Sequence, residues 1–224
     1  MTGFFITFEG GEGSGKTTQL KALLAYLRSR GMDAVPTRDP GGTTIGNQVR
    51  ELLLDGENVR MSPLAELLLY EASRVQLVRE VVRPALTAGR TVLCDRFTDS
   101  TVAYQGYGRG LDLDLVERLN AVATDGLRPD LTFLLDLDPT VGLARVSGRL
   151  AQPCQRRDRL EEEVLEFHQR VRAGYRTLAA REPERVVVLD AAEGMLEIEA
   201  RIRGHVEAHL VAPDPRTAVA PRMG

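Results

Sequence analysis

Apolar residues along the chain follow two patterns, one typical of buried strands and one typical of helices. Five short apolar runs without a helical period predict strands at residues 4–8, 33–37, 91–95, 131–137 and 186–190. Between the first two runs, leucines from Leu20 to Leu27 recur at i, i+3, i+4 and i+7, the spacing of one helix face. A longer helical region follows Ser62, a favoured N-cap residue, has Pro63 at its first position, and ends near Gly89.

This alternation of strands and helices predicts an α/β fold with a five-stranded parallel sheet and helices on both of its faces. The chain has 224 residues, a length that one α/β domain can reach, so a single domain is expected over residues 1–210. The last stretch, residues 211–224, contains three prolines that would break any helix, and we expect it to be a disordered tail.

Charge and cysteine content exclude several classes of function. The formal net charge of −3 provides no basic field that would attract nucleic acid or a membrane surface. The N-terminal apolar run stops at Glu9, too early for a membrane span or a secretory signal. Cys94 and Cys154 are the only cysteines and suggest no disulfide framework. We therefore expect a cytoplasmic protein without nucleic-acid or membrane partners.

The segment from Gly10 to Thr17 matches the phosphate-binding loop pattern G-x-x-x-x-G-K-[ST]. It lies between a predicted strand and a predicted helix, where backbone N–H groups and the helix N-terminus can converge on an anion. Lys16 would reach the β- and γ-phosphates of ATP, and the hydroxyl of Thr17 would hold Mg²⁺. The expected fold is therefore the three-layer P-loop NTPase fold. The loop residues expected to bind ATP are Gly10, Gly11, Glu12, Gly13, Ser14, Gly15, Lys16, Thr17 and Thr18.

Two further pairs of residues favour a small-molecule kinase. Asp95 and Arg96 follow the third strand, at the sheet edge where ligands bind, and could hold Mg²⁺ and a phosphate respectively. Tyr70 and Arg74 share a helix face, where a ring can stack on a base and a guanidinium can donate to a base carbonyl. A GTPase would need a guanine-reading Asn-Lys-x-Asp segment on a later strand, and the sequence has none.

The order of these motifs resembles that of the bacterial thymidylate kinases. The resemblance extends from residue 1 to about residue 210 and rests on the segments Glu9–Thr18, Arg38–Thr43, Arg74–Leu77, Asp95–Phe97 and Ala103–Gly106. It implies a transferase that moves a phosphoryl group from MgATP to dTMP, giving dTDP and ADP in dTTP biosynthesis. It also implies a homodimer.

The resemblance implies roles around the phosphate and sugar of dTMP. Arg38, Arg50 and Arg96 would surround the phosphate of the acceptor. Glu12 would accept a hydrogen bond from the 3′-hydroxyl, and Tyr104 would lie under the deoxyribose and leave no room for a 2′-hydroxyl.

The resemblance also implies which residues bind the base. Tyr70 would stack on thymine in place of the phenylalanine that is common in the family. Arg74 would donate a hydrogen bond to O4 of thymine. Thr101 and Gln105 would lie near the base or the waters that bridge to it.

A lid is expected at about residues 146–160, because a kinase must keep water away from the phosphoryl group that it transfers. The lid would be followed by a helix that opens at Glu161–Glu163. Arginines on a lid can neutralise the charge that develops during transfer. Gly13 stands where some family members have a catalytic arginine, so the lid should supply one, and the candidates are Arg149, Arg157 and Arg159.

We expect direct in-line transfer, with Lys16 and Arg96 as further catalytic residues and Arg145, by the resemblance, stacked on the adenine of ATP. Two alternatives stay open: a P-loop kinase for another nucleoside monophosphate or for a nucleoside, and a nucleotide-dependent switch without turnover. A nucleoside kinase would need a base at the 5′-hydroxyl, for which Glu9 is the candidate. The sequence leaves open the dimer interface, the selectivity against dUMP and the role of the tail.

Overall fold

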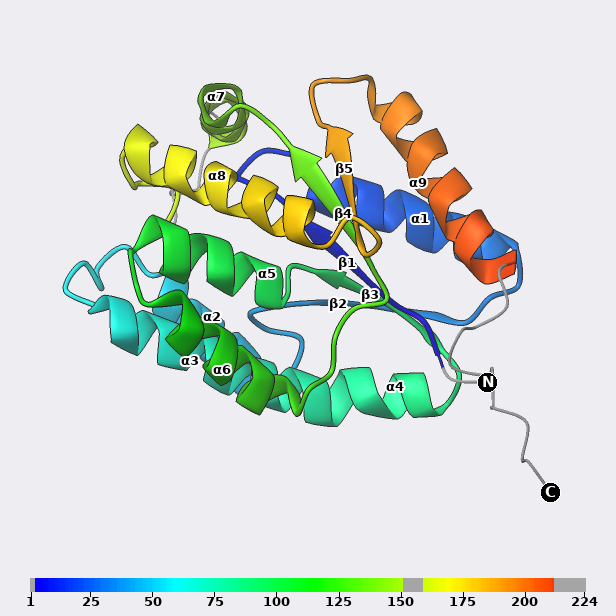
Figure 1. The fold of residues 1–224 in the computed structure, drawn as a ribbon, viewed down its shortest axis with the longest axis horizontal. Coiled ribbons are helices and arrows are strands. Elements are labelled where there is room, and N and C mark those ends of the chain that lie inside the picture. The colour runs from blue at the N-terminus through cyan, green and yellow to red at the C-terminus, as the bar shows by residue number, and fades with distance from the viewer. Residues whose placement is uncertain (1–2, 151–158, 212–224) are drawn as a thin grey trace.

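The computed structural model of the protein describes residues 3–150 and 159–211 and shows a parallel sheet between two layers of helices (Figure 1). The strands follow the order β2-β3-β1-β4-β5, and all the pairings are parallel. Their bounds are β1 Phe5–Glu9, β2 Ala34–Arg38, β3 Thr91–Asp95, β4 Leu131–Asp136 and β5 Val186–Asp190. The predicted sheet is thus confirmed, and no strand end differs from the prediction by more than one residue.

The helices of the described residues include two π-helical segments, labelled η. Their bounds are α1 Lys16–Ser29, α2 Thr44–Leu54, α3 Pro63–Leu77, η1 Val78–Val82, α4 Arg83–Thr87, α5 Thr98–Thr101, η2 Val102–Gly108, α6 Leu113–Thr124, α7 Pro139–Leu150, α8 Leu165–Arg181 and α9 Met195–Val211. The predicted start of the long helical region is confirmed, because Ser62 Oγ accepts a hydrogen bond from the backbone N–H of Ala65 and Pro63 opens α3.

Successive side chains along each strand point to opposite faces of the sheet, so a hydrophobic core forms between each face and the helices that cover it. Ile6 and Phe8 of β1 pack with α1 and α9 on one face of the sheet. Phe5 of the same strand packs on the other face with the region from α3 to α4, and Leu134 packs there with η2 and α8. Figure 1 shows α1 and α9 together on one side of the sheet and α3, α4 and α6 on the other.

One predicted helix begins later than expected, and several helices were not predicted. The helix expected to open at Glu161–Glu163 begins instead at Leu165, because Glu163 Oε1 accepts a hydrogen bond from Arg109 and residues 159–162 form turns. Among the helices that were not predicted are α2, α5–η2 and α6. Most of the expected lid and almost all of the expected tail lie outside the described residues.

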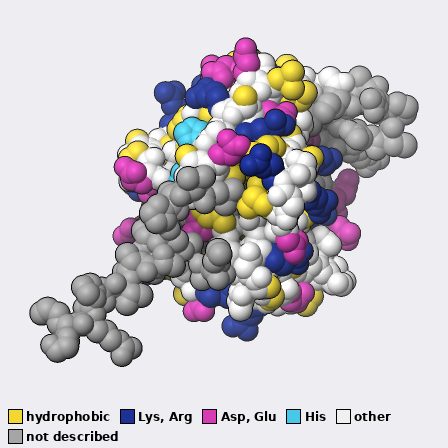
Figure 2. All heavy atoms as spheres, turned by 90° about the vertical axis from the view of Figure 1, so that its right-hand side faces the viewer, with side chains coloured by type: hydrophobic (Ala, Val, Ile, Leu, Met, Phe, Trp, Pro, Cys, Tyr) yellow, Lys and Arg dark blue, Asp and Glu magenta, His cyan; other side chains and the backbone are white. Residues whose placement is uncertain are grey.

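Figure 2 shows the side of the molecule at which α4 and α9 end. Basic and acidic side chains are interspersed over this face, in keeping with the formal net charge of −3. Within residues 3–150 and 159–211, no helix is both long and apolar enough to cross a membrane.

Candidate active site

The phosphate-binding loop connects β1 to α1 and is packed against α7. Gly13 has φ of +67°, in the left-handed region. A Cβ atom on Gly13 would lie 2.3 Å from the carbonyl oxygen of Gly142 in α7. Glycine is therefore required at position 13 both by the turn and by the close approach of α7.

Lys16 lies at the first position of α1, and its ammonium group is directed back over the loop. Its Nζ donates to the carbonyl oxygens of Gly10 at 3.1 Å and Gly11 at 2.8 Å, and to Ser14 Oγ at 3.3 Å. Burial, together with the nearby Arg96, lowers the pKa of Lys16 to about 8. Phosphate oxygens bound in the loop would provide the counter-charge that this ammonium group needs.

Thr17, in the first turn of α1, and Asp95, at the end of β3, are the two residues predicted to hold Mg²⁺, and their side chains meet. The hydroxyl of Thr17 donates to Asp95 Oδ2 at 2.5 Å. A hydroxyl and a carboxylate are hard oxygen donors that suit Mg²⁺, which keeps most of its other positions for water and substrate phosphates. The described residues contain no cluster of three or more His, Cys, Asp or Glu that could hold a metal without a substrate.

Arg96 connects the phosphate-binding loop with the neighbouring pocket. Its backbone has φ of 70°, a left-handed conformation that costs a non-glycine residue about 1–3 kcal/mol. One end of its guanidinium, Nη1, donates to Gly10 O at 3.0 Å and to Tyr175 Oη at 3.1 Å. The other end, Nη2, donates to Glu12 Oε1 at 2.8 Å and to Tyr104 Oη at 3.1 Å.

Glu9 lies directly behind Arg96 and is completely buried. Its oxygens accept hydrogen bonds from the backbone N–H of Phe97 at 2.7 Å, from Ser100 Oγ at 2.6 Å and from Tyr175 Oη at 2.9 Å. Burial and the nearby Asp99 raise the pKa of Glu9 to about 7. A base for a substrate hydroxyl needs access to that hydroxyl, so the geometry does not favour Glu9 in this role.

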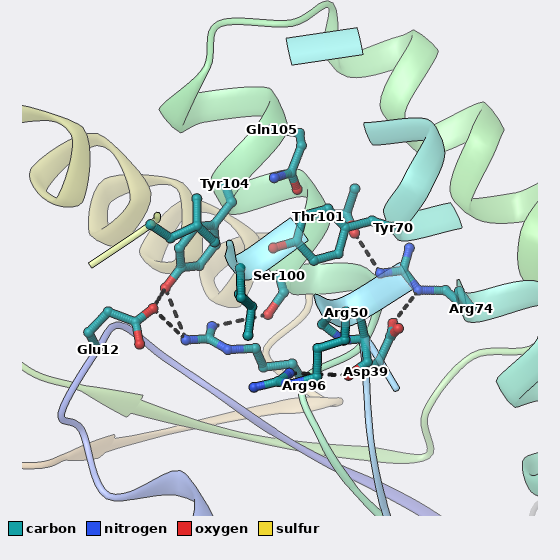
Figure 3. Close-up of a pocket in the computed structure, with 13 residues that line it drawn as sticks. Glu12, Asp39, Arg50, Tyr70, Arg74, Arg96, Ser100, Thr101, Tyr104 and Gln105 are labelled. Carbon is teal, nitrogen blue, oxygen red and sulfur yellow. Dashed lines mark hydrogen bonds and ion pairs between the residues drawn. The ribbon is translucent and has the colours of Figure 1, made fainter. Parts of the chain in front are cut away.

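A pocket opens beside Arg96, and nearly all the residues predicted to bind the acceptor line it (Figure 3). Tyr104 closes one wall: its hydroxyl donates to Glu12 Oε1 at 2.6 Å, and the guanidinium of Arg96 lies 4.9 Å from its ring centre. The residues that line the pocket are Glu12, Asp39, Pro40, Arg50, Leu54, Tyr70, Arg74, Arg96, Ser100, Thr101, Tyr104, Gln105 and Leu160.

Arg38 is the predicted acceptor residue that does not line this pocket. It is exposed at the end of β2, and its Nη2 lies 3.4 Å from Asn47 Oδ1. Arg50 does line the pocket and donates from Nη1 to the carbonyl oxygen of Pro40 at 3.2 Å. The structure therefore brings Arg50 and Arg96 to one pocket and leaves Arg38 outside it.

Arg74 is the most extensively bonded side chain of the pocket and is only 1% exposed. Its Nε donates to Asp39 Oδ2 at 2.6 Å, its Nη1 to Glu71 Oε1 at 2.8 Å and Asn120 Oδ1 at 2.6 Å, and its Nη2 to Thr101 Oγ1 at 2.6 Å. A base carbonyl would therefore share a donor of Arg74 that already has a protein partner.

The arginines predicted near ATP and in the lid occupy different environments. Arg145 is exposed on α7, and its Nη1 lies 3.4 Å from Gly13 O and 3.2 Å from Ala191 O. Arg159 is buried away from the loop and pairs with Glu66. Two other candidates cannot be placed: the side chain of Arg149 and all of Arg157 lie outside the described part of the chain.

Sequence reasoning missed several residues that hold the site together. Asp39 lies inside the segment Arg38–Thr43, and Ser100 directly precedes Thr101, so the sequence provided some indication that both lie near the pocket. Asn120 and Tyr175 had no such indication, because they come from α6 and α8 and reach Arg74 and Arg96 only through the tertiary fold.

The chain is similar to known proteins over nearly its whole length. Residues 8–202 match the family described as thymidylate kinase. A thymidylate kinase of Synechococcus sp. (strain JA-3-3Ab) is 54% identical, covering 95% of this chain and 99% of that protein. One of Deinococcus radiodurans is 56% identical, covering 91% and 98%. The crystal structure of thymidylate kinase from Ehrlichia chaffeensis superposes with a TM-score of 0.74 at 34% identity, covering 92% and 99%.

Proposed function

The chain belongs to the thymidylate kinase family, and from this premise we propose that the loop at Gly10–Thr17 holds ATP while the pocket beside Arg96 holds dTMP. The protein is an enzyme that phosphorylates dTMP to dTDP with ATP, in the synthesis of dTTP. The assignment of each nucleotide to its site is supported by the order of the motifs and by the geometry of the cleft.

The observation that carries this assignment is the position of Arg96 between the two sites. One end of its guanidinium bonds to a carbonyl of the phosphate-binding loop, and the other bonds to Glu12 and Tyr104 of the pocket. A planar guanidinium can bind two anionic groups at once. Arg96 would therefore bring the γ-phosphate of ATP and the phosphate of dTMP together.

The chemistry that follows is direct in-line transfer. An oxygen of the dTMP phosphate attacks the γ-phosphorus of ATP, the bond to the β–γ bridging oxygen breaks, and ADP leaves. The attacking oxygen is already anionic, so no strong general base is required. Lys16 and Arg96 would act by positioning the phosphates and neutralising their charge.

Thr17 and Asp95 are the residues that would hold Mg²⁺, because their oxygens already lie 2.5 Å apart at the mouth of the loop. Magnesium bound there supplies neutralising charge to the β- and γ-phosphates. Both residues would orient it by contributing a hydroxyl and a carboxylate or the waters bonded to them.

Selection of a deoxynucleotide is proposed to depend on Tyr104 and Glu12. The ring of Tyr104 is fixed because its hydroxyl donates to Glu12 Oε1 and accepts from Arg96. A fixed ring under the sugar would exclude a 2′-hydroxyl by contact. The hydrogen bonds from Arg96 and Tyr104 both reach Glu12 Oε1, so Oε2 is the oxygen that would accept from the 3′-hydroxyl. Tyr70, 8% exposed, would present its ring to thymine.

A homodimer in the cytoplasm is the proposed working form. Exposed apolar side chains lie on α2, α3 and α6, and these helices pack beside one another in one layer. Such a surface suits a second copy of the chain. The location is proposed from the sequence, whose two cysteines suggest no disulfide framework.

The test is an ADP-release assay with ATP and a panel of acceptors: dTMP, dUMP, UMP, CMP, AMP, GMP and thymidine. We expect strong turnover with dTMP, weaker turnover with dUMP, little with the others, and loss of activity when EDTA removes divalent cations. Phosphorylation of UMP as fast as dUMP would contradict the role given to Tyr104. Full activity in EDTA would contradict the metal assignment.

A further inference from the structure

A buried carboxylate of α3 lies behind the acceptor pocket and has no role in the chemistry described so far. Glu66 is 0% exposed. Its oxygens accept hydrogen bonds from Gln105 Nε2 at 2.8 Å, from Arg109 Nε and Nη2 at 3.1 Å each, and from Arg159 Nη2. Glu66 therefore joins α3 to η2, to the residue that follows η2, and to residue 159, where the described chain resumes.

Two of these partners lead directly to the wall of the pocket. Gln105 lines the pocket itself. Arg159 precedes Leu160, which also lines the pocket and is 7% exposed. Arg159 is fixed further by its backbone N–H, which donates to Leu54 O at 3.2 Å, and Leu54 is another lining residue.

The charges around Glu66 are balanced in pairs. Arg109 bonds to Glu66 with one edge of its guanidinium and to Glu163 with Nη1, so two arginines face two carboxylates. The guanidinium of Arg109 also lies 4.7 Å from the ring centre of Phe167. Burial would raise the pKa of Glu66, but the hydrogen bonds from Arg109 and Gln105 outweigh it and lower the pKa. Glu66 is thus an ionised acceptor on which three donors depend.

We propose that Glu66 is a positioning residue for the acceptor nucleotide, which holds Gln105 and, through Arg159, Leu160 in the wall of the dTMP pocket. Arg159 is then a partner of Glu66 and not a transfer arginine. This inference rests on the proposed function, because it takes the pocket beside Arg96 as the dTMP site.

A positioning role and a transfer role predict opposite kinetic effects. Loss of Arg159 as a positioning residue loosens the pocket wall and weakens binding of dTMP, while the phosphates still meet at Arg96. We expect Arg159→Met to raise KM for dTMP by about 10- to 100-fold and to change kcat and KM for ATP much less. Loss of a transfer arginine would instead lower kcat by about 10³-fold or more with little change in KM.

The experiment measures kcat and both KM values for Arg159→Met and Glu66→Gln, with circular dichroism melting to show that each variant is folded. Arg181→Met is the matched control, because Arg181 is an exposed arginine whose ion pair with Glu117 spans 3.9 Å. Removal of one partner from a buried ion pair can prevent folding. Arg159→Lys, which keeps a charge opposite Glu66, is the second variant, and its KM for dTMP should lie nearer the wild-type value than that of Arg159→Met.

The double variant Glu66→Gln/Arg159→Met should raise KM for dTMP no further than the larger single effect, because both changes disrupt one contact. The proposal is overturned if kcat falls by a larger factor than KM for dTMP rises, or if neither variant changes KM more than twofold. Tyr70→Ala distinguishes failure of the role given to Glu66 from failure of the pocket assignment. If it raises KM for dTMP while Arg159→Met does not, only the role of Glu66 fails; if it has no effect, the pocket assignment fails as well.

Discussion

Glu9 and Glu12 lie only three positions apart, but their surroundings shift their pKa values in opposite directions. Burial and Asp99 raise the pKa of Glu9 to about 7. Burial would also raise the pKa of Glu12, but Arg96 and Lys16 outweigh it and lower the pKa to about 2. Glu12, which lines the pocket, is therefore ionised at neutral pH. Glu9, which is buried near Arg96, titrates near neutrality.

The raised pKa of Glu9 predicts a loss of stability as the pH rises. Below the unfolded-state value of 4.5 the group is protonated in both states, and between 4.5 and about 7 only the folded protein keeps the proton. The free energy of unfolding should therefore fall across this window by about 3 kcal/mol on account of Glu9 alone. Glu9→Gln removes this dependence, so its stability relative to the wild type should rise from pH 4.5 to pH 7 and then level off.

Urea unfolding at several pH values between 4.5 and 8 checks this prediction. Glu12→Gln is the matched control: the stability that Glu12 provides is present above pH 4.5 and is lost as the pH falls towards about 2. Between pH 4.5 and 8, the free energy of unfolding of Glu12→Gln should therefore differ from that of the wild type by a constant amount. For Glu9→Gln the same difference should change with pH. A constant difference for Glu9→Gln over the same range would show that burial does not raise this pKa.

At the scale of elements, the contact between the phosphate-binding loop and α7 is made by two glycines. A Cβ on Gly142 would lie 2.2 Å from the carbonyl oxygen of Glu12, and a Cβ on Gly13 would lie 2.3 Å from that of Gly142. Backbone therefore lies against backbone, and Arg145 adds a contact from the next turn of α7 to Gly13 O. The position of α7 and the shape of the loop depend on each other.

Gly142→Ala should push α7 away from the loop and weaken ATP binding. We expect a loss of about 1–3 kcal/mol in the free energy of unfolding and a rise in KM for ATP that exceeds the rise for dTMP. Gly148→Ala is the control on the same helix, since a Cβ there meets open space; it should keep both KM values and gain up to about 1 kcal/mol of helix stability. If the two variants had the same stability and the same KM for ATP, α7 would not constrain the loop.

At the scale of the whole molecule, apolar residues on one layer of helices stay exposed. Leu64 and Leu68, four positions apart on α3, are 46% and 49% exposed, and Ile45 and Leu52 on α2 are 50% and 52% exposed. Val122 on α6 is 76% exposed. An isolated exposed leucine needs no explanation, but apolar side chains on adjacent packed helices favour association.

Leu68→Glu should therefore weaken the proposed homodimer. A charge at the centre of this surface would be desolvated on association, so we expect the dimer dissociation constant to rise at least about tenfold. Light scattering after size exclusion should find twice the chain mass of 24.7 kDa for the wild type and a shift towards a single chain for the variant. Leu196→Glu on α9, where Leu196 is 73% exposed, is the control that should stay dimeric. A dimeric Leu68→Glu protein would place the interface elsewhere.

The sequence by itself determined the sheet, the phosphate-binding loop and most of the pocket. Strands such as β1 and β3 are continuous apolar runs because both faces of a parallel sheet are covered, and the loop at Gly10–Thr17 is a local motif whose geometry follows from glycine and the first turn of a helix. Tyr70 and Arg74 lie on α3, whose start was predicted, and Thr101 and Gln105 follow closely after β3, although the helical form of α5–η2 was not predicted.

Only the tertiary structure decided which charges meet. Arg159 and Glu66 are 93 positions apart, and Arg96 and Tyr175 are 79 positions apart, so no local sequence pattern indicates either contact. An arginine in a basic segment looks the same in sequence whether it faces a phosphate or a buried carboxylate, because its partner is chosen by the packing of distant elements. For this reason Arg38 lies outside the pocket, Arg74 is bonded on all sides, and Arg159 is paired with Glu66.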